Sequence, residues 1–271
     1  MTARNEKGAL KARVLLDYSH DKHVGWITID NTAKHNAMSL AMWEQLGAVL
    51  DQLTHTPGLR SVVLRGAGDR AFVSGADISE FVHRRRSPKD VQAYDVAADG
   101  AMDRLYNLEI PTVAMISGIC FGAGMALAMC CDIRIADESS RFSVPAARLG
   151  VGYPLKEIER LLQVVNPPAA LDMLFSGRRL TAAEALAAGV LNQVHPSMDL
   201  EGKVEEYVGI VATNAPLTVR ASKRIVRELS GRGPADEDTC ARLVAACFAS
   251  ADYVEGSTAF MEKRTPRFEG H

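Results

Sequence analysis

Cysteine and histidine are sparse in this sequence, and neither is spaced for a disulfide framework or a metal site. The 271 residues include five cysteines, with no Cys-X-X-Cys pair, and seven scattered histidines. Small disulfide scaffolds carry cysteine far more densely, and structural zinc sites need closely spaced cysteine or histidine pairs. We therefore expect reduced, buried thiols in a cytoplasmic protein without a metal.

The chain also lacks a strong charge of either sign. Its formal net charge is -2 and its isoelectric point is near 6.4, so nothing draws the whole chain to nucleic acid or to an anionic membrane. The one basic run, residues 84–86, precedes a predicted helix and fits a solvated face, with contact to an anionic small molecule as the alternative. Residues 1–11 are polar and lack the apolar core of a signal peptide or anchor, so we expect them to be disordered.

Charge is absent altogether from residues 110–131, a run of 22 positions. Such a run is long enough to cross a bilayer. Pro111, Gly118, Gly122 and Gly124 interrupt it and divide it into a short apolar strand, a tight turn and a short helix. That pattern is typical of a buried strand-turn-helix, and it argues against a membrane span.

Length and periodicity indicate an α/β protein. The chain is 47% hydrophobic and suits one large domain or a domain with an appendage. We expect strands at 24–29, 61–64, 71–74, 112–116 and 133–136, and helices that begin at Ser39, Pro88, Pro154 and the capping box at Thr181. Beyond about residue 200 the strand signals cease, and helices broken at Pro216, 231–234 and Ser250 fill the remainder.

Two of the predicted strands end in small-residue turns, Ser-Gly-Ala-Asp at 74–77 and Phe-Gly-Ala-Gly at 121–124. Small residues let a ligand approach the main chain, and a helix N-terminus presents unpaired N–H donors with positive dipole character. If the two turns face each other, they can hold a developing oxyanion, as acyl-group chemistry requires. A dinucleotide site is the rival, but the second turn lacks the third glycine of that motif, and no glycine-rich turn follows the first strand.

Several short motifs along the chain occur in the order and at the spacing found in one protein family. The motifs are residues 32–38, 71–78 and 118–132, Phe142 with Pro145 and Leu149-Gly150, residues 181–185 with Gly189, and residues 260–264. On these motifs the chain resembles the enoyl-CoA hydratase/isomerase (crotonase) family over about residues 13–268.

The resemblance implies an α/β fold of the crotonase (ClpP-like) type. Residues 12–199 would form a spiral of ββα repeats, and residues 200–271 a helical C-terminal region that trimerises. The implied assembly is a homotrimer or a homohexamer built as a dimer of trimers. The implied substrate is an acyl-CoA thioester of fatty acid metabolism, with coenzyme A as part of the substrate, no covalently bound cofactor, and lyase or isomerase type chemistry. Neither nucleic acid nor a membrane is an expected partner.

The same resemblance implies where the thioester binds. Its carbonyl oxygen is expected between the main-chain N–H groups of Ala76 and Ala123, the second of which is usually glycine in the family. Lys34 falls where the family often contacts CoA phosphates, and Lys263 where a C-terminal helix reaches a neighbour's CoA. Ser79 replaces a lysine that frequently contacts phosphate. The other residues implied in substrate or CoA binding are His35, Ala37, Ser74, Gly75, Asp77, Ile78 and Gly122.

Acidic residues are missing where the family's hydratases need them. A hydratase of this family uses two glutamates to activate water and to protonate the α-carbon, and their positions are occupied here by Ala126 and Ala146. Each positioned acid-base group typically contributes roughly 10²–10⁴-fold to the rate, so simple hydratase activity is not expected. The alternative is that another carboxylate has taken over, and Asp77, Glu80 and Glu157 are the candidates.

Decarboxylation of a malonyl-type thioester is a second hypothesis, because it needs little more than enolate stabilisation. The loop at 149–153 and residues 250–271 are similar to the methylmalonyl-CoA decarboxylase branch, with Tyr153 and Arg148 as catalytic candidates. An apolar pocket would destabilise the carboxylate relative to departing CO2, and a guanidinium could orient it. That branch has an acidic residue at position 126 and a hydroxyl at position 145, which this chain lacks.

Structural roles for the same residues are the competing interpretation. Tyr153 would then pack beside Pro154, and Arg148 would be a surface residue paired with Glu157. A non-catalytic acyl-CoA-binding protein is the third hypothesis.

Overall fold

The computed structural model describes residues 12–77, 79–80, 88–231 and 234–271, and within them the chain forms two β-sheets. The larger sheet contains, in spatial order, β1 (Arg13–Tyr18), β2 (Val24–Asp30), β3 (Ser61–Gly66), β5 (Thr112–Ile116), β7 (Ile133–Asp137) and β10 (Gln193–His195). The smaller sheet contains β4 (Ala71–Val73), β6 (Ile119–Phe121), β8 (Arg141–Ser143) and β9 (Leu180–Thr181).

Successive strands divide between the two sheets. β3, β5 and β7 are parallel neighbours in the larger sheet, whereas β4, β6 and β8, each the next strand along the chain, are parallel neighbours in the smaller sheet. A helix follows each pair of strands. The chain therefore winds as a spiral of ββα units, and the predicted fold class is confirmed.

The sequence pattern does not reveal β1 and β6, nor the short strands β8, β9 and β10. β1 is an edge strand of mixed exposure that pairs only with β2, in an antiparallel hairpin. β6 is only three residues long and lies inside the segment that we expect to be a turn; its ladder comes from β4 and β8. β6 depends on partners distant in the sequence, and β1 is an edge strand without a regular alternation of buried and exposed residues, so local periodicity carries no signal for either.

The described helices are η1 (Thr32–Lys34), α1 (Leu40–Thr54), α3 (Pro88–Asn107), α4 (Ala123–Cys130), α5 (Ala146–Leu149), α6 (Leu155–Leu162), α7 (Pro167–Ser176), α8 (Ala182–Ala187), α9 (Leu200–Thr213), α10 (Pro216–Ser230), α11 (Glu237–Phe248) and α12 (Ala251–Glu262). Helices α1, α3, α6 and α8 begin at or directly after the predicted residues, whereas the sequence pattern does not predict η1, α5 and α7. Ser39 caps α1, Thr181 and Glu184 form the expected capping box of α8, and Ser250 caps α12. Each cap satisfies N–H groups that a helix leaves unpaired at its start.

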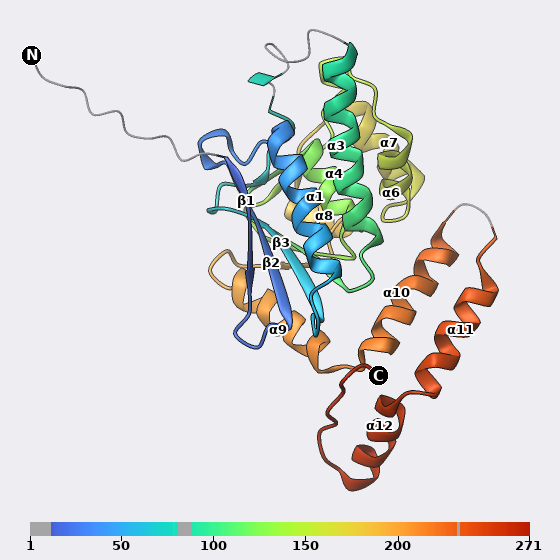
Figure 1. Ribbon diagram of the computed structural model, residues 1–271. Coiled ribbons are helices and arrows are strands. Elements are labelled where there is room, and N and C mark those ends of the chain that lie inside the picture. Colours follow the sequence, from blue (N-terminus) through green and yellow to red (C-terminus); the bar gives the residue numbers. More distant parts are fainter. Residues whose placement is uncertain (1–11, 78, 81–87, 232–233) are drawn as a thin grey trace, which may run out of the picture.

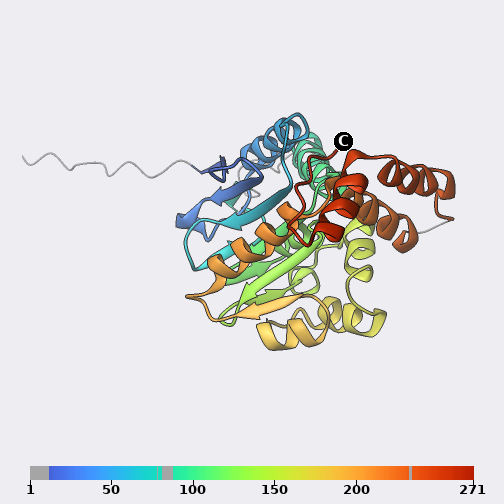
Figure 2. The same ribbon diagram turned by 90° about the horizontal axis from the view of Figure 1, so that it is seen from below.

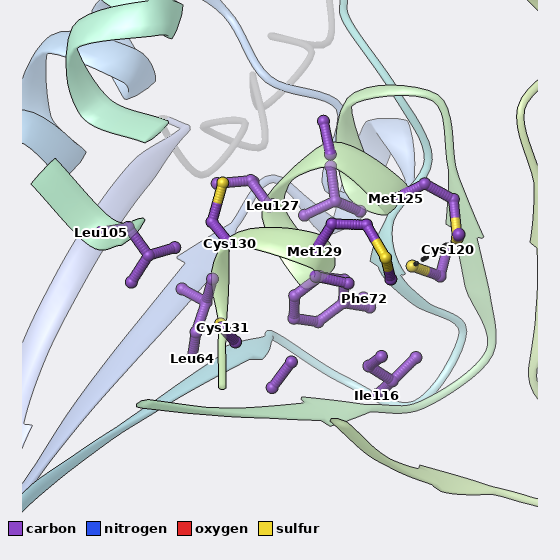
Figure 3. Packing of buried hydrophobic residues seen from close by; sticks show 14 of the residues in the cluster. Leu64, Phe72, Leu105, Ile116, Cys120, Met125, Leu127, Met129, Cys130 and Cys131 are labelled. Carbon is purple, nitrogen blue, oxygen red and sulfur yellow. Dashed lines mark hydrogen bonds between the residues drawn. The ribbon is translucent and has the colours of Figure 1, made fainter. Parts of the chain in front are cut away.

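Both faces of the larger sheet are covered, which explains its continuous apolar strands. In β3, Val62 and Leu64 face the main core, while Val63 faces a second cluster formed with α9. Figure 2 shows α9 lying across that second face. In the main core, side chains of α4 gather around Phe72 of β4, above Ile116 of β5 (Figure 3). The uncharged run at 110–131 thus forms the centre of the protein.

Helices α10–α12 extend away from the two sheets (Figure 1). α10 is tied to the core by Lys223 and Arg227, each 2.7 Å from a carboxylate oxygen of Asp132, which follows α4. Burial lowers the pKa of Lys223 to about 8, although Asp132 partly opposes that shift. Among the described helices, none combines the length and apolar character that crossing a bilayer would require.

The close crossing of α4 over β4 requires glycine at position 124. A Cβ added there would lie 2.1 Å from the Val73 carbonyl oxygen, far inside van der Waals contact. Gly122, the N-cap residue, has φ +51°, a conformation that non-glycine residues rarely adopt. These two glycines therefore allow the start of α4 to sit directly on the end of β4.

We predict that Gly124→Ala lowers the free energy of unfolding by roughly 1–3 kcal/mol or more, because the new methyl group overlaps a backbone carbonyl that cannot move aside. Urea unfolding at neutral pH measures the change. Gly209→Ala is the matched control, because Gly209 lies in helix α9 and an added Cβ meets no atom within 4 Å. The control should gain about 0.5–1 kcal/mol from helix propensity. Equal effects of the two substitutions would contradict the proposed crossing.

Candidate active site

The first small-residue turn follows β4 and is held by a backbone bridge to residue 38. Met38 N–H donates to the Gly75 carbonyl, and Asp77 N–H donates to the Met38 carbonyl, both at 2.9 Å. The Ala76 N–H lies between these two bonds in the chain and takes no part in the bridge. Within the described part of the chain it has no hydrogen-bond acceptor.

The loop that supplies Met38 is held in place by a buried asparagine. Asn36 has φ +57° and is almost fully buried. Its amide donates to the carbonyls of Ala67 and Ala71, and its side-chain oxygen accepts from Asn31 N–H. Asparagine tolerates this left-handed backbone better than most residues do. Asn36 lies within a family motif but is not among the site residues expected from the sequence; an asparagine between a predicted strand and a predicted helix is the signal that was available.

The second turn joins β6 to α4. Gly122 N–H donates to the Ser143 carbonyl at 3.0 Å, and Ala123 is the first residue of α4. The first N–H groups of a helix have no acceptor inside the helix, and no side chain caps this one. Among the described residues nothing accepts a hydrogen bond from the Ala123 N–H. It therefore keeps both a free donor and the positive end of a helix dipole.

The two turns lie against each other. A Cβ built on Gly122 would lie 3.9 Å from the Gly75 Cα, and one built on Gly75 would lie 3.8 Å from the Phe121 carbonyl oxygen. Ala76 and Ala123, each the next residue after one of these glycines, are both partly exposed. Two unpaired N–H groups on adjacent turns form a suitable receptor for an oxygen that gains negative charge.

An ion-pair network supports the first turn. Lys34 Nζ lies 2.6 Å from Asp77 Oδ2 and 2.7 Å from Ser79 Oγ, and Asp77 Oδ1 also accepts from the Ser79 N–H. Burial alone would raise the pKa of the Asp77 carboxyl, but the hydrogen bonds from Lys34 and Ser79 outweigh burial and hold that pKa below its usual value. Lys34, which we expect at a CoA phosphate contact, thus also fixes the end of the Ala76 turn, together with Ser79.

The positions of the missing glutamates lie in an apolar setting. Ala126 is buried within α4, and Ala146 is the partly buried first residue of α5. Ala123, Ala146 and Tyr153 pack against the core cluster that contains Ala126. Burial raises the pKa of the Tyr153 hydroxyl above its ordinary range, and the nearby Glu157 carboxyl adds to the shift.

The three alternative carboxylates differ in their contacts. Asp77 is bound to Lys34, and Glu80 Oε2 accepts from the Leu40 N–H at the start of α1 at 2.9 Å. Glu157 of α6 is only 6% exposed, and its Oε2 atom is buried without any hydrogen-bond partner in the described structure. Burial raises the pKa of Glu157. It is the one candidate of the three with a carboxylate oxygen left unpaired and buried.

The expected surface pairing of Arg148 with Glu157 is wrong. Arg148 is exposed on α5, and its Cδ lies 2.9 Å from the place that a Cβ on Gly177 would occupy, so its methylenes rest at the end of α7. The charged side chains that act on Glu157 are Asp99, Arg160 and Lys156. Glu157 turns into the interior because it lies on the buried face of α6.

The remaining predicted binding residues divide into two groups. His35, Ala37 and Ser74 lie with Lys34 around the first turn, where His35 and Ser74 are joined by a backbone hydrogen bond of 3.1 Å. Lys263 is the exposed C-cap of α12, on the C-terminal helices that extend from the sheets. Ile78 and the arginines at 84–86 lie outside the described residues. Within those residues, no three His, Cys, Asp or Glu side chains form a group that could hold a metal.

The chain is similar to known proteins in both sequence and structure. A model of the family described as enoyl-CoA hydratase/isomerase matches residues 19–271. The short-chain-enoyl-CoA hydratase of Clostridium acetobutylicum is 30% identical over 246 residues, which cover 89% of this chain and 92% of that protein. The carnitinyl-CoA dehydratase of Proteus mirabilis is 31% identical over 242 residues, covering 88% of this chain and 92% of that one. A crystal structure of an enoyl-CoA hydratase/isomerase family protein from Hyphomonas neptunium superposes with a TM-score of 0.89 at 31% identity, covering 94% of this chain and 97% of that chain.

We predict that Lys34→Met lowers the free energy of unfolding by roughly 1–2 kcal/mol at neutral pH, because it leaves the buried Asp77 carboxylate without its cation. The folded-state pKa of Asp77 is below its unfolded value, so this stabilisation is present above about pH 4 and disappears as pH falls through the lowered pKa. The difference between wild type and variant should therefore shrink at acid pH. Urea titrations across this range measure it.

Lys203→Met is the control, since Lys203 forms an exposed pair with Glu206. It should change stability little at any pH. A Lys34→Met effect that does not vary with pH would contradict the ion-pair explanation.

Proposed function

The chain belongs to the enoyl-CoA hydratase/isomerase family, and from that premise we propose that it binds an acyl-CoA thioester with the thioester oxygen between the N–H groups of Ala76 and Ala123. The observation that carries the proposal is the presence of two unpaired N–H groups on glycine turns that touch each other. Both relatives described above are named for enzymes that act on CoA thioesters. Coenzyme A enters as part of the substrate, and the proposed chemistry needs no further cofactor.

The proposed chemistry is stabilisation of a thioester enolate. Hydrogen bonds to the carbonyl oxygen strengthen as that oxygen gains negative charge, so they lower the energy of the enolate more than that of the bound thioester. The dipole of α4 acts in the same direction at Ala123. Because the two N–H groups are fixed by β-bridge and helix geometry, they need no reorganisation when charge develops.

Ordinary hydration of a simple enoyl-CoA is not part of the proposal. Ala126 and Ala146 supply methyl groups where two carboxylates would handle water and the α-proton. Without them, addition of water loses roughly 10²–10⁴-fold for each absent group. The proposed reaction is therefore one in which the enolate is the central species, of lyase or isomerase type.

Decarboxylation of a malonyl-type thioester is the second candidate, and the apolar packing of Ala126, Ala146 and Tyr153 favours it. Two observations favour a neutral acyl group instead. Arg148 is exposed with its methylenes against α7, and the buried carboxyl of Glu157 lies near Tyr153 and would repel a substrate carboxylate when ionised. A non-catalytic acyl-CoA-binding protein is the third candidate.

The assembly proposed on the same premise is a homotrimer or a dimer of trimers. Large apolar side chains are exposed on α10–α12, among them Leu229, Phe248, Phe260 and Met261. Exposed apolar patches of this kind are typical of subunit interfaces. Lys263 lies at the end of α12 and would reach the CoA of a neighbouring subunit.

We predict that Ala123→Pro reduces enolate-forming activity by roughly 10²–10³-fold, because it removes one of the two N–H donors. Proline is well tolerated at the first position of a helix, so the fold should survive. Ala123→Gly keeps the N–H and is the control that should retain activity. Thioester α-proton exchange in D2O measures the rate, and retained exchange in the proline variant would exclude this N–H from the site.

A substrate panel separates the three candidates. We expect crotonyl-CoA to be hydrated slowly, a nonhydrolysable acyl-CoA analogue to bind, and methylmalonyl-CoA to release little CO2; product analysis and calorimetry measure these outcomes. Rapid hydration would contradict our interpretation of positions 126 and 146. CO2 release that survives Tyr153→Phe would support decarboxylation without a role for that hydroxyl. Analogue binding without turnover of any thioester would favour the binding protein, and failure to bind would exclude all three.

A further inference from the structure

Glu157 is a buried residue of helix α6. Its helix, α6, packs against α4. Glu157 acts on the pKa of Tyr153 and on that of Cys130, so it lies near both. Ala123, Ala126 and Cys130 share one face of α4 because they are three and four residues apart. The Glu157 carboxyl therefore lies along the same helical face that begins at the Ala123 N–H.

Position 126 is the point on that face where the family's first glutamate would stand. Cys130 lies one helical turn beyond it, a rise of ~5.4–6 Å along the axis. Alanine at 126 and at 146 leaves the space of two glutamate side chains unfilled by carboxylates. A carboxyl supplied by α6 would therefore be the acidic group of a region in which α4 and α5 carry alanine.

The two cations nearby form structural contacts with other residues. Arg160 donates to Asp103 at 2.5 Å and lies over the Tyr106 ring, 5.1 Å from its centroid. Lys156 pairs with Asp103 at 2.7 Å. Neither cation forms an ion pair with Glu157, and its Oε2 atom has no donor among the described residues. A buried polar atom without a partner costs stability, and such groups persist where function needs them.

We propose that Glu157 is the proton-transferring carboxyl of this site, taking over from the two absent glutamates. The inference rests on the proposed function. In the forward step the Glu157 carboxylate takes a proton from the α-carbon of the bound thioester, and the C–H electron pair moves toward the carbonyl oxygen held by Ala76 and Ala123. In the reverse step the Glu157 carboxylic acid returns that proton to the α-carbon, and the enolate becomes the thioester again.

The surroundings adjust Glu157 for both steps. Burial raises its pKa, and Asp99 of α3 raises it further, while Arg160 and Lys156 of α6 lower it. Tyr153 and the Cys130 thiol of α4 complete the titratable groups around it. A carboxyl with a raised pKa is a stronger base when ionised and remains a proton donor at higher pH than an exposed glutamate.

Hydrogen exchange at the α-carbon tests the inference. Wild-type protein is incubated with butyryl-CoA in D2O, and deuterium at the α-carbon is followed by mass spectrometry. Glu157→Gln should lose exchange by roughly 10²–10⁴-fold while still binding a nonhydrolysable acyl-CoA analogue. Glu159→Gln, two residues away on the same helix, is the matched control and should exchange like wild type. Glu157→Ala should recover part of the exchange when formate is added, because the small carboxylate can occupy the vacated space.

The outcomes separate the two proposals. If wild type fails to bind the analogue, the proposed function is wrong and the inference falls with it. If wild type binds but does not exchange, the binding-protein candidate is favoured and Glu157 has no proton to transfer. If wild type exchanges and Glu157→Gln exchanges equally fast, the proposed function stands and Glu157 is excluded as the proton-transferring group. Stability gives a second readout. Because the folded-state pKa of Glu157 is raised, wild type should lose stability relative to Glu157→Gln as pH rises above about 4. A variant that is less stable than wild type at every pH, with exchange unaltered, would indicate a structural carboxylate.

Discussion

The contact between two backbone turns is the constraint on which the rest of this structure depends. Gly75 and Gly122 lie in the turns that follow strands β4 and β6, which are adjacent and parallel in the smaller sheet, so the two turns emerge at the same edge and touch. The bridge from Met38 satisfies the backbone on either side of Ala76 but leaves its N–H free. Helix geometry does the same at Ala123. An apolar core beneath both turns keeps these donors in place without pairing them.

The two buried carboxylates of this region, Asp77 and Glu157, have opposite environments. Asp77 is buried with a lysine, a hydroxyl and an N–H as partners, and its ionised form is stabilised. Glu157 is buried with one oxygen unpaired, and its ionised form is destabilised. The first arrangement fixes a loop, because removing either partner leaves an unpaired group. The second arrangement, an unpaired buried carboxylate, lowers stability, as expected where selection favours chemistry over packing.

Much of the fold could be predicted because its signals are local. Helix starts at Ser39, Thr181 and Ser250 follow from capping chemistry, and the central apolar strands follow from burial on both faces. Strands β1, β6, β8, β9 and β10 could not be predicted: β6 depends on ladder partners distant in the sequence, β8 to β10 are only two or three residues long, and β1 is an edge strand without regular alternation. The two turns could be recognised from their glycines, but their contact is a property of the parallel sheet. Among Asp77, Glu80 and Glu157, sequence offers no basis for a choice, because the partner of each lies on another element.

The sequence by itself determined the α/β class, the two small-residue turns and the absence of glutamate at positions 126 and 146, and its motifs resemble a family whose fold implies the ββα architecture. The first three features reside in residue identity and short-range spacing. Only the tertiary structure decided that Lys34 is bound to Asp77, that Arg148 does not pair with Glu157, and that Glu157 is buried with an unpaired oxygen. The physical reason is that the ionisation and availability of a side chain depend on its burial and its partners, and α6, α4 and the turn after β4 meet only in the folded chain.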